Sequence, residues 1–361
     1  MLPARFGPAK KPRTWFDADT LGPMDLRPAL ERLVGGNDLE PVEAESLMAF
    51  LVGGEATDAQ IGGALMALAS KGCAGAELAA FARVLRNSAI SVSSSFPDLV
   101  DTCGTGGGAP SFNLSTAAAF VAAAGGAKVA KHGNRAVTSA CGSADVLEAL
   151  GARIEADPER VEHLLETVGV AFLFAPAFHP AMKNVGKVRR ELGVRTVFNQ
   201  LGPLANPAGA RRQMIGVWDA RYLRPIGEAL LLLGAERAYV VHGEDGLDEV
   251  SPAARTQYVK VWGGRIEEGT FNPQDFGLEP ISQDSLAPGA SAQENAAILR
   301  EAIANPDSPR SRAVLPSSAV ALLLSGRVDG LDEAAGLAKE AIRSGEAARK
   351  LDQFVAASQG Q

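Results

Sequence analysis

A glycine-rich segment carries the clearest chemical signal in the sequence. Residues 101–116 read DTCGTGGGAPSFNLST, with glycines at positions 104, 106, 107 and 108. Glycine lets a backbone adopt positive φ angles and approach a ligand closely. Hydroxyl and amide side chains follow where a helix is expected to begin near residues 115–116, and the start of a helix favours bound phosphate. The segment therefore predicts a phosphate or pyrophosphate cradle, with a tight turn and an ordinary N-cap as the alternative.

Two well-known phosphate loops do not match this segment. A P-loop ends in G-K-[ST], which is absent from the segment. The residues Gly104, Gly106 and Ala109 satisfy a loose dinucleotide fingerprint, but that reading requires an acidic residue about 20 positions later to hold the ribose. No Asp or Glu stands between Asp101 and Asp145. A dinucleotide-dependent dehydrogenase is therefore disfavoured.

A basic segment and an acidic pair complete the candidate site. Lys131–Arg135 reads KHGNR and places up to three positive charges and one amide on an expected turn after a strand, which favours an anion site over a solvated charged face. Asp248 and Glu249, in GLDEVSP, lie in another expected turn, and paired carboxylates suit Mg²⁺. Ser143 is expected to be an N-cap, a phosphate donor or both.

The elements that must position these residues follow from hydrophobic spacing. Residues 24–91 show helical spacing in four short segments, and Thr57 with Gln60 fits a capping box. From residue 98, apolar strand-like runs alternate with helical stretches, which predicts an α/β fold with a mainly parallel sheet. Ligands bind at the carboxyl ends of such strands, so the three motifs are expected to line one crevice. Residues 181–212 interrupt the alternation, and packing helices are expected after Val314.

Composition bounds the class of protein. The 361 residues are 46% hydrophobic and 21% charged, which is ordinary for a globular chain. Three sparse cysteines favour reduced thiols and a cytoplasmic location, and the four histidines lack zinc-ligand spacing. The net charge of −7 disfavours nucleic-acid binding. No apolar run is long enough to span a membrane, and residues 1–25 are expected to form a loosely ordered extension rather than a secretory signal.

Five motifs in order carry a resemblance to a known family. The motifs are GTGG…FNLST, KHGNR, GSADVLEALG, HPAMKNVGKVRRELGVRTVFNQLGPLANP and GLDEVSP. Together they resemble the anthranilate phosphoribosyltransferase family over about residues 26–357. The resemblance implies a small helical domain (26–95 with 182–212), an α/β domain (96–181 with 213–361) and a homodimer formed through the helical domain. The implied activity, part of tryptophan biosynthesis, moves the phosphoribosyl group of phosphoribosyl pyrophosphate to the amine of anthranilate, with Mg²⁺.

The resemblance also implies roles for particular residues. The donor-binding set is Gly104, Gly107, Gly108, Ser111, Asn113, Leu114, Ser115, Thr116, Lys131, His132, Gly133, Asn134, Arg135, Ala136, Val137, Thr138, Ser139 and Ser143. The anthranilate-binding set is Gly104, Asn134, His179, Arg189 and Pro203, and the metal-associated set is Ser115, Asp248 and Glu249. Lys131, His132 and Arg135 are the implied catalytic residues. Because an aryl amine is neutral at pH 7, the reaction needs no strong base.

One departure from the family and two alternatives remain open. The family commonly reads G-T-G-G-D-G, whereas here Gly107 is followed by Gly108 and Ala109 in a loop one residue shorter. The missing carboxylate predicts weaker magnesium binding at this loop and shallower inhibition by excess magnesium. A pyrimidine nucleoside phosphorylase-like enzyme shares the fold but should lack the paired KHGNR and GLDEVS motifs. A non-catalytic nucleic-acid-binding relative would need a basic surface.

Overall fold

A seven-stranded sheet forms the centre of the molecule in the computed structural model, which describes residues 25–136 and 141–360. The strand order is β3-β2-β1-β4-β5-β6-β7, and the first five strands are parallel. The strands are β1 (Val100–Asp101), β2 (Val129–Gly133), β3 (Val170–Phe174), β4 (Arg212–Gly216), β5 (Arg237–Gly243), β6 (Thr256–Trp262) and β7 (Arg265–Phe271). The expected α/β class with a mainly parallel sheet is confirmed.

An antiparallel hairpin at one edge of the sheet was not expected from the sequence. β6 pairs with both β5 and β7, and Gly263 and Gly264 form the turn with φ of +58° and +75°. Two successive positive φ angles are what a tight hairpin turn requires. Much of β7 is exposed, as on an edge strand, so its sequence lacks the apolar run that marks β1–β5.

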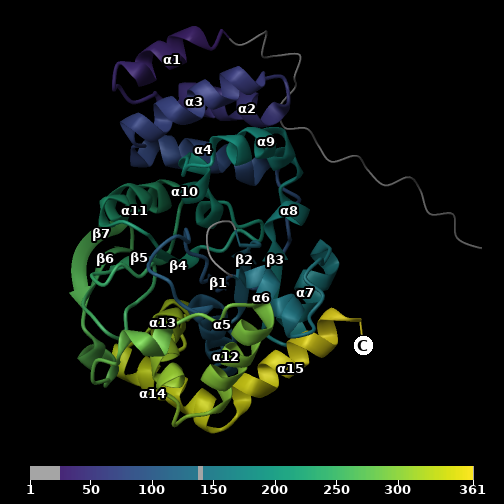
Figure 1. Ribbon diagram of the computed structural model, residues 1–361, viewed down its shortest axis with the longest axis vertical. Helices are drawn as coiled ribbons and strands as arrows, with labels where there is room; N and C mark the ends of the chain where they lie inside the picture. The colour runs from purple at the N-terminus through teal and green to yellow at the C-terminus, as the bar shows by residue number, and fades with distance from the viewer. Residues whose placement is uncertain (1–24, 137–140, 361) are drawn as a thin grey trace, which may run out of the picture.

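Helices of the N-terminal part form a separate layer above the sheet (Figure 1). They are α1 (Arg27–Val34), α2 (Pro41–Gly53), α3 (Asp58–Lys71) and α4 (Gly75–Ser88), and α9 (Lys183–Leu192) and α10 (Val197–Leu204) pack against them. The expected capping box of α3 is present, since the Gln60 N–H donates to Thr57 Oγ1 at 3.3 Å and the Thr57 N–H donates to Gln60 Oε1 at 2.9 Å. The interrupting segment 181–212 thus supplies two helices to this layer.

The remaining helices surround the other parts of the sheet. They are α5 (Leu114–Ala124), α6 (Ser143–Ala149), α7 (Pro158–Thr167), α8 (Ala175–Phe178), α11 (Leu223–Leu232), α12 (Ala292–Ala304), α13 (Pro309–Ser325), α14 (Leu331–Arg343) and α15 (Glu346–Ser358). Short 3₁₀ turns occupy Pro180–Met182, Ala220–Tyr222, Pro273–Phe276 and Gln283–Leu286. Among the described residues, no helix is long and apolar enough to cross a membrane.

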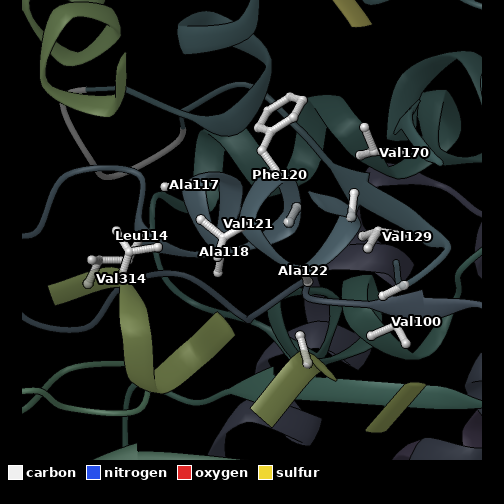
Figure 2. Packing of buried hydrophobic residues seen from close by; sticks show 14 of the residues in the cluster. Val100, Leu114, Ala117, Ala118, Phe120, Val121, Ala122, Val129, Val170 and Val314 are labelled. Carbon is white, nitrogen blue, oxygen red and sulfur yellow. The ribbon is translucent and has the colours of Figure 1, made fainter. Parts of the chain in front are cut away.

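Two hydrophobic cores lie on opposite faces of the sheet. Along β5, Ala238 and Val240 belong to the core shared with α4 and α11, whereas Tyr239 and Val241 belong to the core shared with α5 and α13. This alternation follows from the two-residue period of a strand. Figure 2 shows the alanine-rich α5 packed in the second core. Small side chains let α5 lie close to α13, and a Cβ on Gly125 would come within 2.6 Å of Leu322.

The chain topology places a crevice at the centre of the sheet. β1 pairs with β2 on one side and β4 on the other. The chain runs outward from β1 through β2 to β3 and then crosses to β4 on the other side of β1. In such sheets ligands bind at this switch point, outside the carboxyl ends of the strands. The segments that follow β1, β4 and β5 all emerge at this edge, which is where the candidate site lies.

Candidate active site

One cavity of about 630 Å³ brings the predicted motifs together. The predicted site residues on its wall are Gly104, Gly107, Gly108, Ser111, Asn113, Leu114, Ser115, Thr116, Lys131, His132, Gly133, Asn134, Arg135, Ala136, Ser143, Arg189, Pro203, Asp248 and Glu249. His179 is not on the wall, and Val137, Thr138 and Ser139 lie outside the described residues. The three motifs therefore share one crevice, as their position after parallel strands predicts.

The glycine loop (residues 104–109) packs directly on the acidic loop (residues 244–249). The Ala109 N–H donates to the Gly246 carbonyl at 2.8 Å. A Cβ on Gly108 would lie 2.6 Å from both the backbone nitrogen and Oδ1 of Asp248, so no larger residue fits there without movement. Gly106 and Gly107 have φ of +69° and +87°, angles that favour glycine. Contact with the acidic loop thus restricts which residues the short glycine loop can carry.

The start of α5 presents polar groups without partners. The helix begins at Leu114 with Asn113 as its N-cap residue, one to two positions earlier than expected. Asn113 Nδ2 donates to the Cys141 carbonyl at 3.1 Å, whereas Asn113 Oδ1 and Thr116 Oγ1 are buried without a hydrogen-bond partner among the described residues. Buried polar atoms normally have partners. These two atoms are therefore placed to bind a polar ligand.

Lys131 and His132 lie within β2, so the expectation that all of KHGNR forms a turn is wrong. The strand continues because Gly133 still pairs with Phe174 of β3. Lys131 Nζ donates to the Thr102 carbonyl at 3.2 Å and to Ser115 Oγ at 3.2 Å. No carboxylate within the described residues lies at ion-pair distance from this buried ammonium, although Asp101 and Glu249 feel its charge through space. Direct contact with a negative charge is therefore left for an anionic ligand.

Burial keeps His132 neutral, so the upper bound of three positive charges expected for KHGNR is not reached. Burial, followed by the charge of the neighbouring His179, lowers the pKa of His132 to about 3. Nδ1 lies 3.0 Å from the Gly202 carbonyl, so the proton of the neutral ring belongs on Nδ1. Nε2 is then a buried acceptor without a partner. The His179 ring is 5.2 Å away, centroid to centroid, and stands behind the cavity wall.

Arg135 and Ser143 also differ from expectation. The Arg135 guanidinium pairs with Asp145 at 3.2 Å and with Glu148, both on α6, so it is not a free cation facing the cavity. Ser143 is the first residue of α6 and the N-cap is Gly142, so the N-cap interpretation of Ser143 is wrong. Asp145 explains this, because its carboxylate accepts the Gly142 N–H at 2.9 Å and already caps the helix.

Glu249 is buried and Asp248 is half-buried, so neither is a fully solvated carboxylate. Burial, followed by the charge of Asp248, raises the pKa of Glu249 to about 7. Burial also raises the pKa of Asp248. Ser317 of α13 donates to Glu249 Oε2 at 3.2 Å, and the Ser115 hydroxyl lies beside the same carboxylate. Neither carboxylate makes an ion pair with a described residue. Two adjacent carboxylates that are largely shielded from water in this way are a costly arrangement that a cation would relieve.

These donors suit magnesium as a partner. Carboxylate and hydroxyl oxygens are hard ligands, and Mg²⁺ commonly uses one or two carboxylates together with waters and substrate phosphates. The described residues contain no group of three or more His, Cys, Asp or Glu side chains that could hold a metal ion by themselves. Magnesium held by Asp248 and Glu249 would therefore depend on a phosphate-bearing ligand to complete its coordination.

A cationic wall is formed by α9 and α10. The Arg189 guanidinium lies over the Phe198 ring, 5.0 Å from its centroid, and burial lowers its pKa. It makes no ion pair with any carboxylate in residues 25–136 or 141–360. Pro203, inside α10, lies on the same cavity. The wall thus combines an unpaired planar cation with an apolar ring, which suits an aromatic carboxylate.

Three contributors were missed from the sequence. Asp101, at the end of β1, accepts hydrogen bonds from the His132 N–H at 3.1 Å and from Asn206 Nδ2 at 2.7 Å. Arg195 reaches the glycine loop, and Ser317 supports Glu249. Asp101 carried a signal, because it is an acid at the end of a buried strand beside the glycine loop. The partners of Arg195 and Ser317 are far away in the chain and left no pattern.

Comparisons with known proteins agree with this architecture. Residues 27–89 match the helical bundle domain, and residues 96–348 the a/b domain, of a glycosyl transferase family. Anthranilate phosphoribosyltransferase of Moorella thermoacetica is 48% identical over 332 residues, covering 92% of this chain and 98% of the relative. That of Alkalilimnicola ehrlichii is 46% identical over 333 residues, covering 92% and 98%.

Solved structures give the same result. The anthranilate phosphoribosyltransferase of Thermus thermophilus has a TM-score of 0.86 and 44% identity, covering 92% of this chain and 99% of its own. The enzyme of Saccharomyces cerevisiae in complex with PRPP and Mg has a TM-score of 0.82 and 29% identity, covering 93% and 98%. Fold and site thus define a glycosyltransferase with a helical bundle and an α/β domain. Within that class, the chain belongs to the anthranilate phosphoribosyltransferase family, which confirms the expected resemblance.

Proposed function

We propose that this protein transfers the phosphoribosyl group of 5-phosphoribosyl 1-pyrophosphate to the amine of anthranilate. The products are N-(5-phosphoribosyl)anthranilate and pyrophosphate, and the step belongs to tryptophan biosynthesis. The observation that carries the proposal is one cavity lined by the glycine loop, by Lys131, which makes no ion pair with a described residue, and by the half-buried Asp248 with the buried Glu249. Yeast relatives in complex with PRPP and Mg, and with 4-fluoroanthranilate, support it.

The departure of pyrophosphate is the demanding part of this reaction. The bond between the ribose C1′ and the pyrophosphate oxygen breaks, which leaves positive charge on the sugar and negative charge on the leaving group. Lys131 and the N-terminal end of α5 supply fixed positive potential at the same cavity. Groups that are already oriented towards developing charge give the largest catalytic contribution. We therefore assign leaving-group stabilisation to Lys131, with Asn113 and Thr116 holding the donor.

Anthranilate would meet the wall of α9 and α10. Its carboxylate suits the planar Arg189 guanidinium, and its ring suits the apolar surface near Phe198 and Pro203. The amine is neutral and attacks C1′ directly, so positioning is the main requirement. His132, with an unprotonated Nε2 and a low pKa, is suited to accept a hydrogen bond from the acceptor and is not suited to donate a charge. Arg135 is left with the role of tying the chain just after β2 to α6.

Magnesium is the proposed cofactor, held by Asp248, Glu249 and Ser115. A bound Mg²⁺ would neutralise charge on the pyrophosphate. The glycine loop offers no carboxylate of its own, because Gly108 occupies the position where relatives commonly carry Asp and a Cβ would collide with Asp248. Inhibition by excess magnesium is therefore expected to be shallow, and a magnesium titration at fixed donor concentration tests this.

The test of the proposed function is product formation. Mixing the protein with donor, Mg²⁺ and anthranilate should release pyrophosphate and change the fluorescence of anthranilate, and leaving out any one component should abolish both signals. A second mixture, of protein with a pyrimidine nucleoside and phosphate, tests the phosphorylase alternative. Release of the free base in this mixture, with no release of pyrophosphate in the first, would overturn the proposal. The non-catalytic alternative is tested by the electrophoretic mobility of nucleic acid with and without the protein, since binding would retard the nucleic acid.

Assembly and location are proposed on separate grounds. We propose a homodimer formed through the helical layer, supported by the exposed Val34, Val42 and Met66 on α1, α2 and α3. Light scattering of the protein and of Met66→Glu tests the dimer, which the charge should dissociate. A cytoplasmic location is supported by the three sparse cysteines, and cell fractionation tests it.

A further inference from the structure

Arg195 joins the helical layer to the glycine loop. It stands in the short connection between α9 and α10, which pack on α2, α3 and α4 (Figure 1). Its Nη2 donates to the Gly107 carbonyl at 2.7 Å, across 88 positions of the chain. Its guanidinium also lies over the Trp218 ring, 5.0 Å from the centroid. Arg195 makes no ion pair with any carboxylate in the described part of the chain, so the loop carbonyl and the ring are its direct contacts. Its charge also favours the ionised form of Asp248 through space, and Arg195 lines the cavity itself.

A single peptide unit of the glycine loop is held from both sides. The Gly107 carbonyl accepts from Arg195, and the Gly108 side of the same peptide packs against Asp248, whose carboxylate its N–H faces. In a trans peptide these two groups point in opposite directions. The peptide therefore bridges the helical layer on one side and the acidic loop on the other.

This peptide is flanked by residues that allow it to rotate. Gly106, Gly107 and Gly108 carry no side chain, and the first two have positive φ. Glycines populate both signs of φ with similar ease. Rotation of the unit would turn the Gly107 carbonyl oxygen towards the Asp248 carboxylate and remove the N–H from it. The local sequence does not prevent this, so the contacts on either side must.

We propose that Arg195 is a positioning residue that selects the orientation of the 107–108 peptide and so keeps the glycine loop seated on the acidic loop for donor binding. The inference rests on the proposed function for the identity of the donor. Arg195 acts through the loop backbone, whereas Arg189, six positions earlier, faces the acceptor wall. The two arginines thus serve different substrates.

Direct binding of the donor separates this proposal from the overall reaction. Phosphoribosyl pyrophosphate, together with Mg²⁺, is titrated into the protein in a calorimeter. Arg195→Ala should bind the donor about tenfold or more weakly than the wild type, the usual effect of losing a hydrogen bond to a charged group. The KM for the donor should rise to match, with the KM for anthranilate changed less than about twofold. Donor binding without product from anthranilate would count against the proposed function but leave the Arg195 test intact.

Arg221→Ala is the matched control. Arg221 also stacks on an aromatic ring, that of Tyr222 at 4.9 Å, and it lies outside the cavity wall. It should leave donor affinity unchanged. Equal melting temperatures of Arg195→Ala and the wild type would show that the loss is not general destabilisation. Arg195→Lys, which keeps a donor but not the planar stack, should recover part of the affinity; no recovery relative to Ala would overturn the role of the Gly107 contact.

A double-mutant cycle tests the route through the peptide. A Cβ on Gly107 would lie 2.8 Å from the Arg195 guanidinium, so Gly107→Ala should itself weaken donor binding. If Arg195 acts through this peptide, the two substitutions should not have additive effects, because the residues are in contact. The donor affinity of the double variant should then lie within about threefold of that of the weaker-binding single variant. If the loss of donor affinity in the double variant equals the product of the two single losses, Arg195 acts elsewhere and the proposal is overturned.

Discussion

Two buried pairs of lysine and glutamate, one in each part of the molecule, differ in how completely they are satisfied. In the helical layer, Lys71 Nζ lies 2.7 Å from Glu77 Oε2 and 2.6 Å from Asp38 Oδ1. In the cavity, Lys131 makes only neutral hydrogen bonds, and Glu249 accepts from hydroxyls while its neighbour Asp248 repels it. Both pairs are shielded from water, but only the first is neutralised by direct contact.

The contrast indicates that the cluster around Glu77 is structural, whereas the one around Glu249 is functional. Glu77 also accepts the N–H groups of Leu39 and Ala74 at 2.9 Å each, so its oxygens tie three segments of the helical layer together. Among the described residues, the cavity carboxylates have no comparable set of donors, and they share the cavity wall with Asn113 and Thr116, whose buried oxygens also lack partners there. Buried charges that the protein compensates only through space, without direct contact, are most simply explained by a charged ligand. Four predictions test that explanation.

The largest expected effect comes from the two lysines. Lys131→Met should lower kcat/KM by about a thousandfold, since it removes a preorganised charge from the leaving group, with little loss of stability. Lys71→Met should leave kcat and both KM values unchanged but lower the free energy of unfolding, because it leaves Glu77 buried without its cation. Steady-state kinetics and urea unfolding measure the two. If Lys131→Met lost stability rather than activity, the comparison would fail.

The two glutamates should respond in opposite ways to the same change. Glu77→Gln should lower the free energy of unfolding by about 3 kcal/mol, the usual cost of breaking a buried ion pair, without altering turnover. Glu249→Gln at pH 8, in the absence of metal, should be as stable as the wild type or more so, because burial already opposes ionisation of this carboxyl. It should also require more Mg²⁺ for half-maximal activity. Equal destabilisation by both changes would show that Glu249 is structural.

The sequence was sufficient to predict the parts that depend on chain order. Parallel strands place their carboxyl ends at one edge, so the glycine loop and the acidic loop could be expected to meet from their positions alone. What it could not predict was the partner of each polar group. Arg135 and Arg195 look alike as exposed basic residues, yet one pairs with α6 and the other holds a loop carbonyl 88 positions away. The β6–β7 hairpin was missed because an edge strand has no apolar run.

Arg189 tests whether the cavity distinguishes its two substrates. Arg189→Ala should raise the KM for anthranilate by about tenfold to a hundredfold, the range expected for a lost charge-assisted hydrogen bond. The KM for the donor should change little, because the guanidinium stands on the α9–α10 wall over Phe198. Arg190→Ala, which removes the adjacent basic residue of α9 outside the cavity wall, is the control. Equal increases for both substrates would remove Arg189 from the acceptor site.

The smallest expected effect concerns a buried group that is neutral in the folded state. Burial lowers the pKa of His132 from 6.5 to about 3, so below pH 6.5 the unfolded chain gains a proton that the folded chain does not. Stability contributed by the neutral ring is therefore complete above pH 6.5 and falls as the pH falls towards 3. At pH 5 the loss amounts to about 2 kcal/mol. His132→Asn should show a correspondingly shallower decline in the free energy of unfolding between pH 7 and pH 5, measured by urea unfolding. Parallel curves for the two proteins would mean that the ring takes up a proton in the folded state, and His132 would then be a cation of the site after all.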